Sequence, residues 1–130
     1  MPSISKQSGN HQDYGPVEAW RDEVDAHVIE FVHFKQDIDS TPMLKGLPND
    51  QCHCPHWGYV LKGKVTFTID GREEVLEPGD AFYVPPGHLQ RAEAGTEIVQ
   101  FSPAKEMAEV EQQIMKNMQA MQASAGTGTH

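Results

Sequence analysis

Closely spaced turn signals divide the middle of the chain into short segments, and they constrain the fold more than any other feature. Asp70-Gly71 is a strong hairpin signal, and turns at Pro78–Asp80 and Pro85–Gly87 follow at short intervals. Segments rich in Val, Ile, Phe and Tyr lie between these turns, which is the pattern of consecutive antiparallel strands. The sequence therefore predicts an all-β domain built from a meander of short strands.

After Ser102 the apolar residues recur at helical spacing. Ser102 suits a helix cap and Pro103 the first helical position, and a first long strand is expected over Val24–Phe34. The helical stripe consists of Met107, Val110, Ile114, Met118 and Met121. We therefore expect an N-terminal arm over residues 1–22, a β-domain over 23–102, an amphipathic helix over 103–123 and a disordered tail over 124–130.

The charge balance limits the classes of partner. The formal net charge is -9 at pH 7, and an acidic chain without clustered Lys and Arg does not suit a nucleic-acid groove or an anionic membrane surface. No apolar run is long enough for a membrane span, and the first residues contain no hydrophobic segment of the signal-peptide kind. We therefore expect a cytoplasmic protein that binds a small-molecule ligand or substrate, with no nucleic acid and no membrane partner.

Four potential metal ligands are concentrated between Cys52 and His56. Because side chains alternate along a strand, Cys52, Cys54 and His56 would share one face, and His53 would lie on the other. The two cysteines are too close in sequence for an unstrained disulfide, so we predict free thiols. Thiolate sulfur and imidazole nitrogen are zinc ligands and also suit some iron sites. Alternatively, the cysteines are small core residues and His56 is an interior histidine without a metal.

A second segment, Gly79 to His88, contains a turn, an apolar strand and a Pro-Pro-Gly corner that ends at a histidine. Together with the first segment it resembles the two signature motifs of the cupin superfamily in the spacing of Gly63, Gly79, Pro85 and Gly87. The resemblance covers residues 24–101 and implies a jelly-roll β-barrel of a kind that commonly binds a metal in its interior. The predicted fold is thus a cupin-type jelly-roll β-barrel with a C-terminal amphipathic α-helix.

The resemblance implies ligand positions that this chain fills with altered residues. Counted from Gly63, the ligand positions of the first motif fall on Asp50, Cys52 and His56. In the second motif the histidine position falls on Gln90, whereas the histidine itself is His88. One strand repeat separates the two, so both can face the same interior.

We therefore predict a metal site made of four residues, Cys52, Cys54, His56 and His88. Asp50 and Gln90 are alternate ligands or outer-shell partners that would orient the imidazoles. His53 is a further alternate, because a bulge at Pro55 would turn it inward. Zinc is the expected metal, with iron next.

Three functions stay open. The first is a metal-dependent enzyme of the dioxygenase, isomerase or lyase type, because the resemblance implies such enzymes and a barrel interior is a ready pocket for a small organic molecule. The second is a non-catalytic zinc-binding or sensing module in which two Cys and two His close the tetrahedron. The third is a metal-free small-ligand binder. We also expect a homodimer, because an open barrel leaves sheet edges and the helix offers an apolar stripe.

Overall fold

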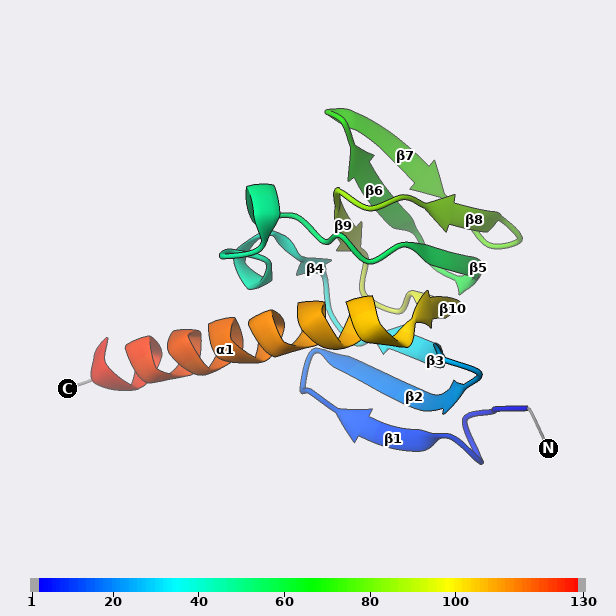
Figure 1. Ribbon diagram of the computed structural model, residues 1–130, viewed down its shortest axis with the longest axis horizontal. Helices are drawn as coiled ribbons and strands as arrows, with labels where there is room; N and C mark the ends of the chain where they lie inside the picture. The colour runs from blue at the N-terminus through cyan, green and yellow to red at the C-terminus, as the bar shows by residue number, and fades with distance from the viewer. Residues whose placement is uncertain (1–2, 129–130) are drawn as a thin grey trace.

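The computed structural model describes residues 3–128, with side chains through Met121. Two antiparallel sheets are followed by one C-terminal helix (Figure 1). The first sheet has six strands in the order β1-β2-β3-β10-β5-β8, and the second has four in the order β4-β9-β6-β7. The elements are β1 (Asn10–Asp13), β2 (Val17–Val24), β3 (His27–Phe34), β4 (Ile38–Asp39), η1 (Thr41–Met43), η2 (Pro48–Asp50), β5 (His56–Lys62), β6 (Val65–Ile69), β7 (Arg72–Leu76), β8 (Ala81–Val84), β9 (His88–Ala92), β10 (Glu97–Pro103) and α1 (Ala104–Gly128).

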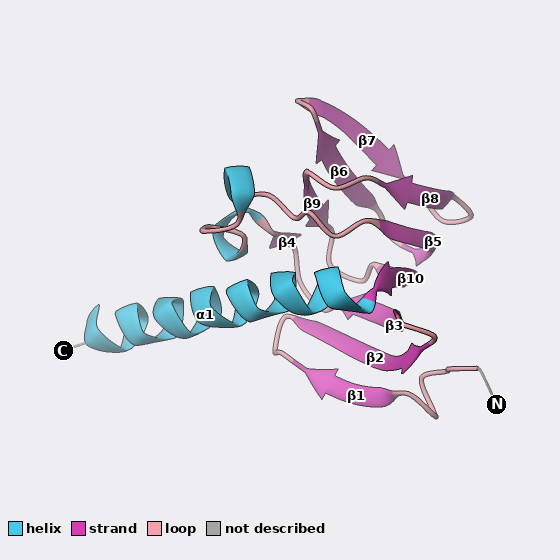
Figure 2. Ribbon diagram, in the orientation of Figure 1, coloured by secondary structure: helices cyan, strands magenta, loops and turns pink. Residues whose placement is uncertain are grey.

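The two sheets enclose the main hydrophobic core, so the predicted all-β architecture with a C-terminal helix is confirmed (Figure 2). Inward side chains of β3, β5, β8 and β10 pack against those of β6 and β9, as strand alternation requires. The buried members of this core are Val32, Phe34, Val60, Val65, Phe67, Val84, Ala92 and Ile98.

The Asp70-Gly71 hairpin is confirmed. It joins β6 to β7, and the last strand pair before the turn is Ile69 with Arg72. Asp70 has a φ of 51° and Gly71 a φ of 75°. Both values are positive, as the two-residue turn that best matches strand twist requires, and Asp-Gly tolerates them.

A second hydrophobic cluster lies between α1 and the segment that leads into β5. Leu44, Cys52, Cys54 and Val110 are its buried members, and Met107 and Ile114 pack against it. The amide of Asn117 donates to the Met43 carbonyl at 2.6 Å and to the Lys45 carbonyl at 2.9 Å. The first turns of the predicted helical stripe therefore cover the cysteine segment, whereas Met121 is 50% exposed.

The N-terminal segment differs from the expected arm, because residues 10–13 and 17–24 form strands β1 and β2. β2 pairs with β3 along its whole length, from Val17 with Phe34 to Val24 with His27. The strand expected over Val24–Phe34 begins instead at His27, because Asp25 and Ala26 adopt positive φ values and form the β2–β3 turn. Pairing with a neighbouring strand satisfies the backbone of a segment whose sequence carries little apolar periodicity.

The helix also differs at both ends from its predicted limits of 103–123. Pro103 ends β10, and Ser102 belongs to that strand and does not cap the helix. At the other end the helical backbone continues to Gly128, so residues 124–128 of the expected tail are helical and residues 129–130 lie outside the described residues. Alanine and serine are compatible with helix, which allows the backbone hydrogen bonds to continue. Within the described residues, no helix is both long and apolar enough to cross a bilayer.

Candidate metal centre

Three of the four residues predicted as metal ligands converge inside the protein. The ligand atoms of Cys52, His56 and His88 all lie within 4.8 Å of one another, and all three residues are buried. Cys52 Sγ is 3.7 Å from His56 Nε2, and sulfur and nitrogen ligands of a tetrahedral zinc lie ~3.5 Å apart. The donor set therefore fits a zinc-sized ion after a small contraction. Within the described residues this is the one group of His, Cys, Asp or Glu side chains that converges in this way.

Backbone pairing holds the two halves of the site together. Cys52 and His88 form an antiparallel bridge, with N–H···O distances of 2.9 and 3.1 Å. The Gly87 N–H also donates to the Cys52 carbonyl at 2.8 Å. Gly87 has a φ of 90°, which a side-chain-bearing residue rarely adopts. The Pro-Pro-Gly corner thus delivers His88 next to Cys52, while His56 enters as the first residue of β5.

Each imidazole has a fixed hydrogen-bond partner on its other nitrogen. His88 Nδ1 lies 2.8 Å from the Pro85 carbonyl, which can only accept, so Nδ1 carries the proton and Nε2 keeps a free lone pair. His56 Nδ1 lies 2.7 Å from Ser102 Oγ. Such outer partners orient metal-binding histidines. The role of Ser102 was missed in the sequence, although alternation along β10 places Ser102 on the same inward face as Ile98.

Burial sets the protonation of the three groups. It lowers the pKa of His56 to about 3, with a further contribution from His88. Burial likewise lowers the pKa of His88 and raises that of Cys52 to about 11. At neutral pH both imidazoles are therefore neutral, which is the form that binds metal, and the Cys52 thiol is protonated.

Metal binding is expected to release about one proton per site at neutral pH, because Cys52 must ionise to become a ligand and the imidazoles are already neutral. Calorimetric titration of the metal-free protein in buffers of different ionisation enthalpy measures this number. A Cys54→Ser variant should release the same number. Release of about two protons, falling by one in Cys54→Ser, would show that both thiols coordinate.

Cys54 lies apart from the other three donors. Its Sγ faces the carbonyls of Pro55 at 3.5 Å and Pro103 at 4.0 Å, and the residue has no exposed surface. Residues 53–55 are not a strand, so the alternation that placed Cys52, Cys54 and His56 on one face does not operate there. Burial and the nearby Cys52 raise the pKa of Cys54 to about 12.

The three alternate residues also lie outside the group. Asp50 is exposed, and its carboxylate accepts a hydrogen bond from the Gly46 N–H at 3.0 Å. His53 Nε2 lies 2.7 Å from the Pro48 carbonyl in η2, so the bulge that would turn it inward does not form. Gln90 is half-buried on β9, one strand repeat beyond His88.

A second buried polar group occupies the inner face of the six-stranded sheet. Gln100 Nε2 donates to Glu30 Oε1 at 2.6 Å, and Arg21 Nε is 4.0 Å from Glu30 Oε2. Arg21 also forms an ion pair with Glu111 of α1. Gln100 is one strand repeat from Ser102 on β10, so this group extends along the same interior wall as the partner of His56. Sequence reasoning did not identify these residues.

The Glu30→Gln variant is expected to have a higher free energy of unfolding than the wild type at neutral pH, because it removes a carboxyl whose charged form is disfavoured by burial. Burial raises the pKa of Glu30, and Glu111 adds to the shift, although Arg21 and Gln100 oppose it. The folded protein thus holds this proton more tightly than the unfolded chain, and wild-type stability falls as the pH rises through the raised pKa.

Urea unfolding measures the difference in unfolding free energy between the variant and the wild type at two pH values, one neutral and one below the ordinary pKa of Glu. The difference should vanish at the lower pH. The exposed Glu109→Gln in α1 is the matched control and should change stability little. Destabilisation by Glu30→Gln at neutral pH would show instead that the Arg21 ion pair outweighs burial.

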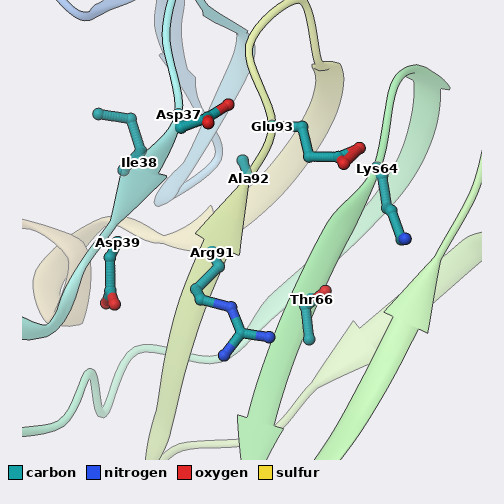
Figure 3. A pocket seen from close by; sticks show the side chains of 8 residues that line it. All are labelled: Asp37, Ile38, Asp39, Lys64, Thr66, Arg91, Ala92 and Glu93. Carbon is teal, nitrogen blue, oxygen red and sulfur yellow. The ribbon is translucent and has the colours of Figure 1, made fainter.

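Two of the cavities in the described part of the chain are lined by charged side chains and lie beside the barrel. One of about 390 Å³ lies on β4, β6 and β9, and Figure 3 shows that Arg91, Lys64 and Glu93 line it without any of the converging donors. The other, of about 700 Å³, lies between the β2–β3 turn and the start of α1. Arg21 and Glu111 line this second cavity, so it borders the buried polar group around Glu30.

Comparisons with known proteins show a shared fold. The family model of the cupin domain matches residues 51–99, a segment that contains all three converging donors. The chain is similar to an RmlC-like cupin from Shewanella frigidimarina, with 21% identity and a TM-score of 0.59 over 82% of this chain and 94% of that chain. It is also similar to the polyketide cyclase RemF from Streptomyces resistomycificus, with 15% identity and a TM-score of 0.59 over 80% of both chains.

A third similar structure is HEPD from Streptomyces albus, determined with Fe(II) bound. It shares 17% identity and a TM-score of 0.51 over 74% of this chain but only 24% of that chain. No curated protein sequence matches the chain. The fold and the buried donors thus define a jelly-roll protein with a potential metal site. The chain has a cupin-type jelly-roll fold, and the family model of the cupin domain covers residues 51–99 of it.

Proposed function

We propose that this protein is a metal-dependent enzyme that acts on a small organic molecule within the cupin barrel. The supporting observation is that three donors converge and the fourth predicted ligand, Cys54, lies apart. Catalytic metal sites commonly use three protein ligands and leave a position for water or substrate, whereas structural zinc sites use four. The convergence of Cys52, His56 and His88 therefore favours an open site over a closed one.

Zinc is the first proposed metal, because a mixed sulfur and nitrogen donor set is typical of zinc, and iron is the second. When bound, either metal would supply Lewis acidity to a coordinated oxygen. Ser102 and the Pro85 carbonyl would hold the two imidazoles in their binding orientation.

Dioxygenases, isomerases and lyases include enzymes that require a metal acting as a Lewis acid on a coordinated oxygen. Glu30 and Gln100 provide a buried carboxyl and an amide on the same interior wall as Ser102. Groups of this kind can orient a substrate or exchange a proton with it, because a carboxyl with a raised pKa carries a proton closer to neutral pH. The interior therefore offers polar partners to a small organic molecule in addition to the metal.

Elemental analysis of protein purified without added metal tests the site. We expect one zinc or iron per chain in the wild type and in Cys54→Ser, and loss of the metal in a Cys52→Ser, His56→Ala double variant. Full metal content in the double variant would contradict the proposed ligands. Absence of metal from a wild-type protein that also fails to take up zinc or iron would support the metal-free ligand binder.

The second candidate is a non-catalytic zinc-binding or sensing module, and the deep burial of the three donors favours it. Their relative exposures are only 7% for Cys52, 5% for His56 and 2% for His88. Substitution with Co(II) separates the two functions, because an exogenous ligand such as azide changes the visible spectrum only when it can reach an open position. A spectrum that azide does not alter would support the closed module.

A further inference from the structure

The C-terminal helix covers one side of the candidate metal centre. Cys52, His56 and His88 are all buried. Val110 of α1 packs in one cluster with Cys52 and Cys54. Figure 2 shows α1 between the short helices η1 and η2 and the strand β2. A ligand from solvent therefore needs part of this surrounding structure to move before it reaches the donors.

The junction between β10 and α1 defines the point about which the helix can turn. The helix begins at Ala104, directly after Pro103 at the end of β10. The Ala104 N–H donates to the Ala26 carbonyl at 2.9 Å, which holds the start of the helix on the β2–β3 turn. Because the start is held and the hydrogen-bonded helix is stiff, a movement of α1 swings its later turns about this junction.

A polar contact further along fastens α1 to the segment that joins η1 to η2. The amide of Asn117 donates to the carbonyls of Met43 and Lys45. Gln113 Nε2 donates to Asn117 Oδ1 at 3.1 Å and so orients that amide. The segment comes so close that a Cβ added to Gly46 would lie 2.9 Å from Gln113 Nε2. We call the two hydrogen bonds of Asn117 to this segment the helix latch.

A second contact fastens α1 to the six-stranded sheet. Glu111 forms an ion pair with Arg21 of β2, and Arg21 also lies 4.0 Å from Glu30 of β3. At 3.6 residues per turn, Glu111 and Asn117 lie about 120° apart around the helix. The ion pair and the helix latch therefore hold different sides of α1, and release of the helix breaks both.

The apolar attachment of α1 is small. Among the helix residues whose side chains are described, only Val110 is buried, and Met107 and Ile114 are partly buried. Elements with few buried apolar contacts open at lower free energy than the core of a protein. The polar contacts therefore contribute a large part of what keeps the helix closed.

The cavity of about 700 Å³ beside the start of α1 lies on the way to the donors. Arg21 and Glu111 line it, so the ion pair that fastens the helix is also part of the cavity wall. Val28 lines it too, and pairs with Ser102 across β3 and β10. Because Ser102 contacts His56, an opening at the ion pair extends the cavity towards the candidate metal centre.

We propose that α1 is a gate for the candidate metal centre, which opens when the helix latch and the Arg21–Glu111 ion pair release together and the helix turns about its junction with β10. The open gate admits metal ions and small molecules to the donors. The identity of these ligands rests on the proposed function. The movement does not, because it exposes Cys54 whether or not a metal binds.

Thiol labelling measures the opening. Cys54 has no exposed surface and packs beneath α1, so in metal-free Cys52→Ser it reacts with an alkylating reagent only while the gate is open. Asn117→Ala should speed this labelling by about 10-fold, because it removes two hydrogen bonds that each favour the closed form by roughly threefold. Alanine favours helix more than asparagine does, so a weaker helix would not explain faster labelling.

Further substitutions in α1 test whether the helix moves as one body. Glu111→Ala should speed labelling by about threefold, and its combination with Asn117→Ala should multiply the two factors. The exposed Gln112→Ala is the matched control and should label at the parent rate. The same ratios should appear in metal-free protein that retains both thiols, which guards against a fold disturbed by Cys52→Ser. An unchanged rate in Asn117→Ala or Glu111→Ala would overturn the gate.

Urea distinguishes the gate from global unfolding. Detachment of one helix exposes little new surface, so the labelling rate should depend only weakly on low concentrations of urea. The free energy of global unfolding should depend on urea more steeply, because that dependence scales with the surface exposed. Labelling with the steep dependence of global unfolding would show that α1 does not open separately.

Zinc exchange gives a second readout that is tied to the proposed function. The helix latch lies outside the donors and is closed in the free and the bound protein, so Asn117→Ala should raise the rates of zinc uptake and release by the same factor. The dissociation constant should stay unchanged. Stopped-flow mixing with a chromophoric chelator measures both rates, and unchanged rates would overturn the gate. A protein that binds no zinc or iron would contradict the proposed metal site instead, and thiol labelling alone would then decide the gate.

Discussion

Replacing His88 with alanine is expected to weaken metal binding by about 100-fold or more, because loss of an outer-shell partner alone typically costs 10- to 100-fold. His88 is the donor that the second motif contributes, and its backbone bridge to Cys52 places it across the site from β5. Its Nδ1 is held by the Pro85 carbonyl, which leaves Nε2 for the metal. Competition with a chromophoric chelator measures the affinity.

Gln90→Ala is the matched control, because Gln90 is one strand repeat away on the same strand and occupies the position that the superfamily spacing assigns to histidine. We expect it to change metal affinity much less, since its half-buried side chain lies outside the converging group. An essential Gln90 together with a dispensable His88 would show that the superfamily spacing is retained and that His88 is only a turn residue.

Replacing Gly63 with alanine is expected to lower the free energy of unfolding by about 3 kcal/mol. Gly63 ends the β5 segment with a φ of +80°, and an added Cβ would lie 2.3 Å from Thr96 Oγ1 and 2.6 Å from Thr96 Cα. The left-handed backbone costs roughly 1–2 kcal/mol for a residue with a side chain, and overpacking adds about 1–3 kcal/mol. Thr96 cannot easily move, because its hydroxyl bonds both the N–H and the carbonyl of Lys64.

Gly71→Ala separates the cost of the left-handed backbone from the cost of overpacking. Gly71 has a similar φ of +75°, but no atom lies within 4 Å of the position that its Cβ would take. The Gly71→Ala variant should therefore lose only about 1 kcal/mol of unfolding free energy, which is the cost of the backbone conformation. Urea unfolding of both variants measures the difference. Equal losses at the two glycines would contradict the close approach of Gly63 to Thr96.

The part of the fold after Trp57 could be predicted because its signals are local. Asp70-Gly71 specifies a two-residue hairpin through backbone conformation alone. β1 and β2 lacked such signals, because every residue of β1 is exposed and only Ala19 of β2 is buried. β2 forms because it pairs with β3, and β1 forms because it pairs in turn with β2.

The types of metal ligand in the candidate site could be predicted from the sequence, but the set of residues that converge could be predicted only in part. Alternation along an extended strand grouped Cys54 with Cys52 and His56, but the chain around Pro55 is not a strand, and Cys54 faces α1 instead. Ser102 was predicted to cap the helix but lies in β10 and contacts His56. The local sequence is the same for both roles, so it could not distinguish them. In both cases the outcome depends on segments that lie far apart in the chain.

The sequence by itself determined which side chains are available as donors and where the tight turns fall, because these depend on residue type and short-range spacing. The cupin-type barrel was implied by the resemblance of two segments to the motifs of that superfamily. Tertiary structure decided which donors meet. The bridge between Cys52 and His88, the hydroxyl of Ser102 and the cover of α1 over Cys54 join segments separated by dozens of residues. No local pattern encodes such distances, since they arise only when the two sheets and the helix pack together.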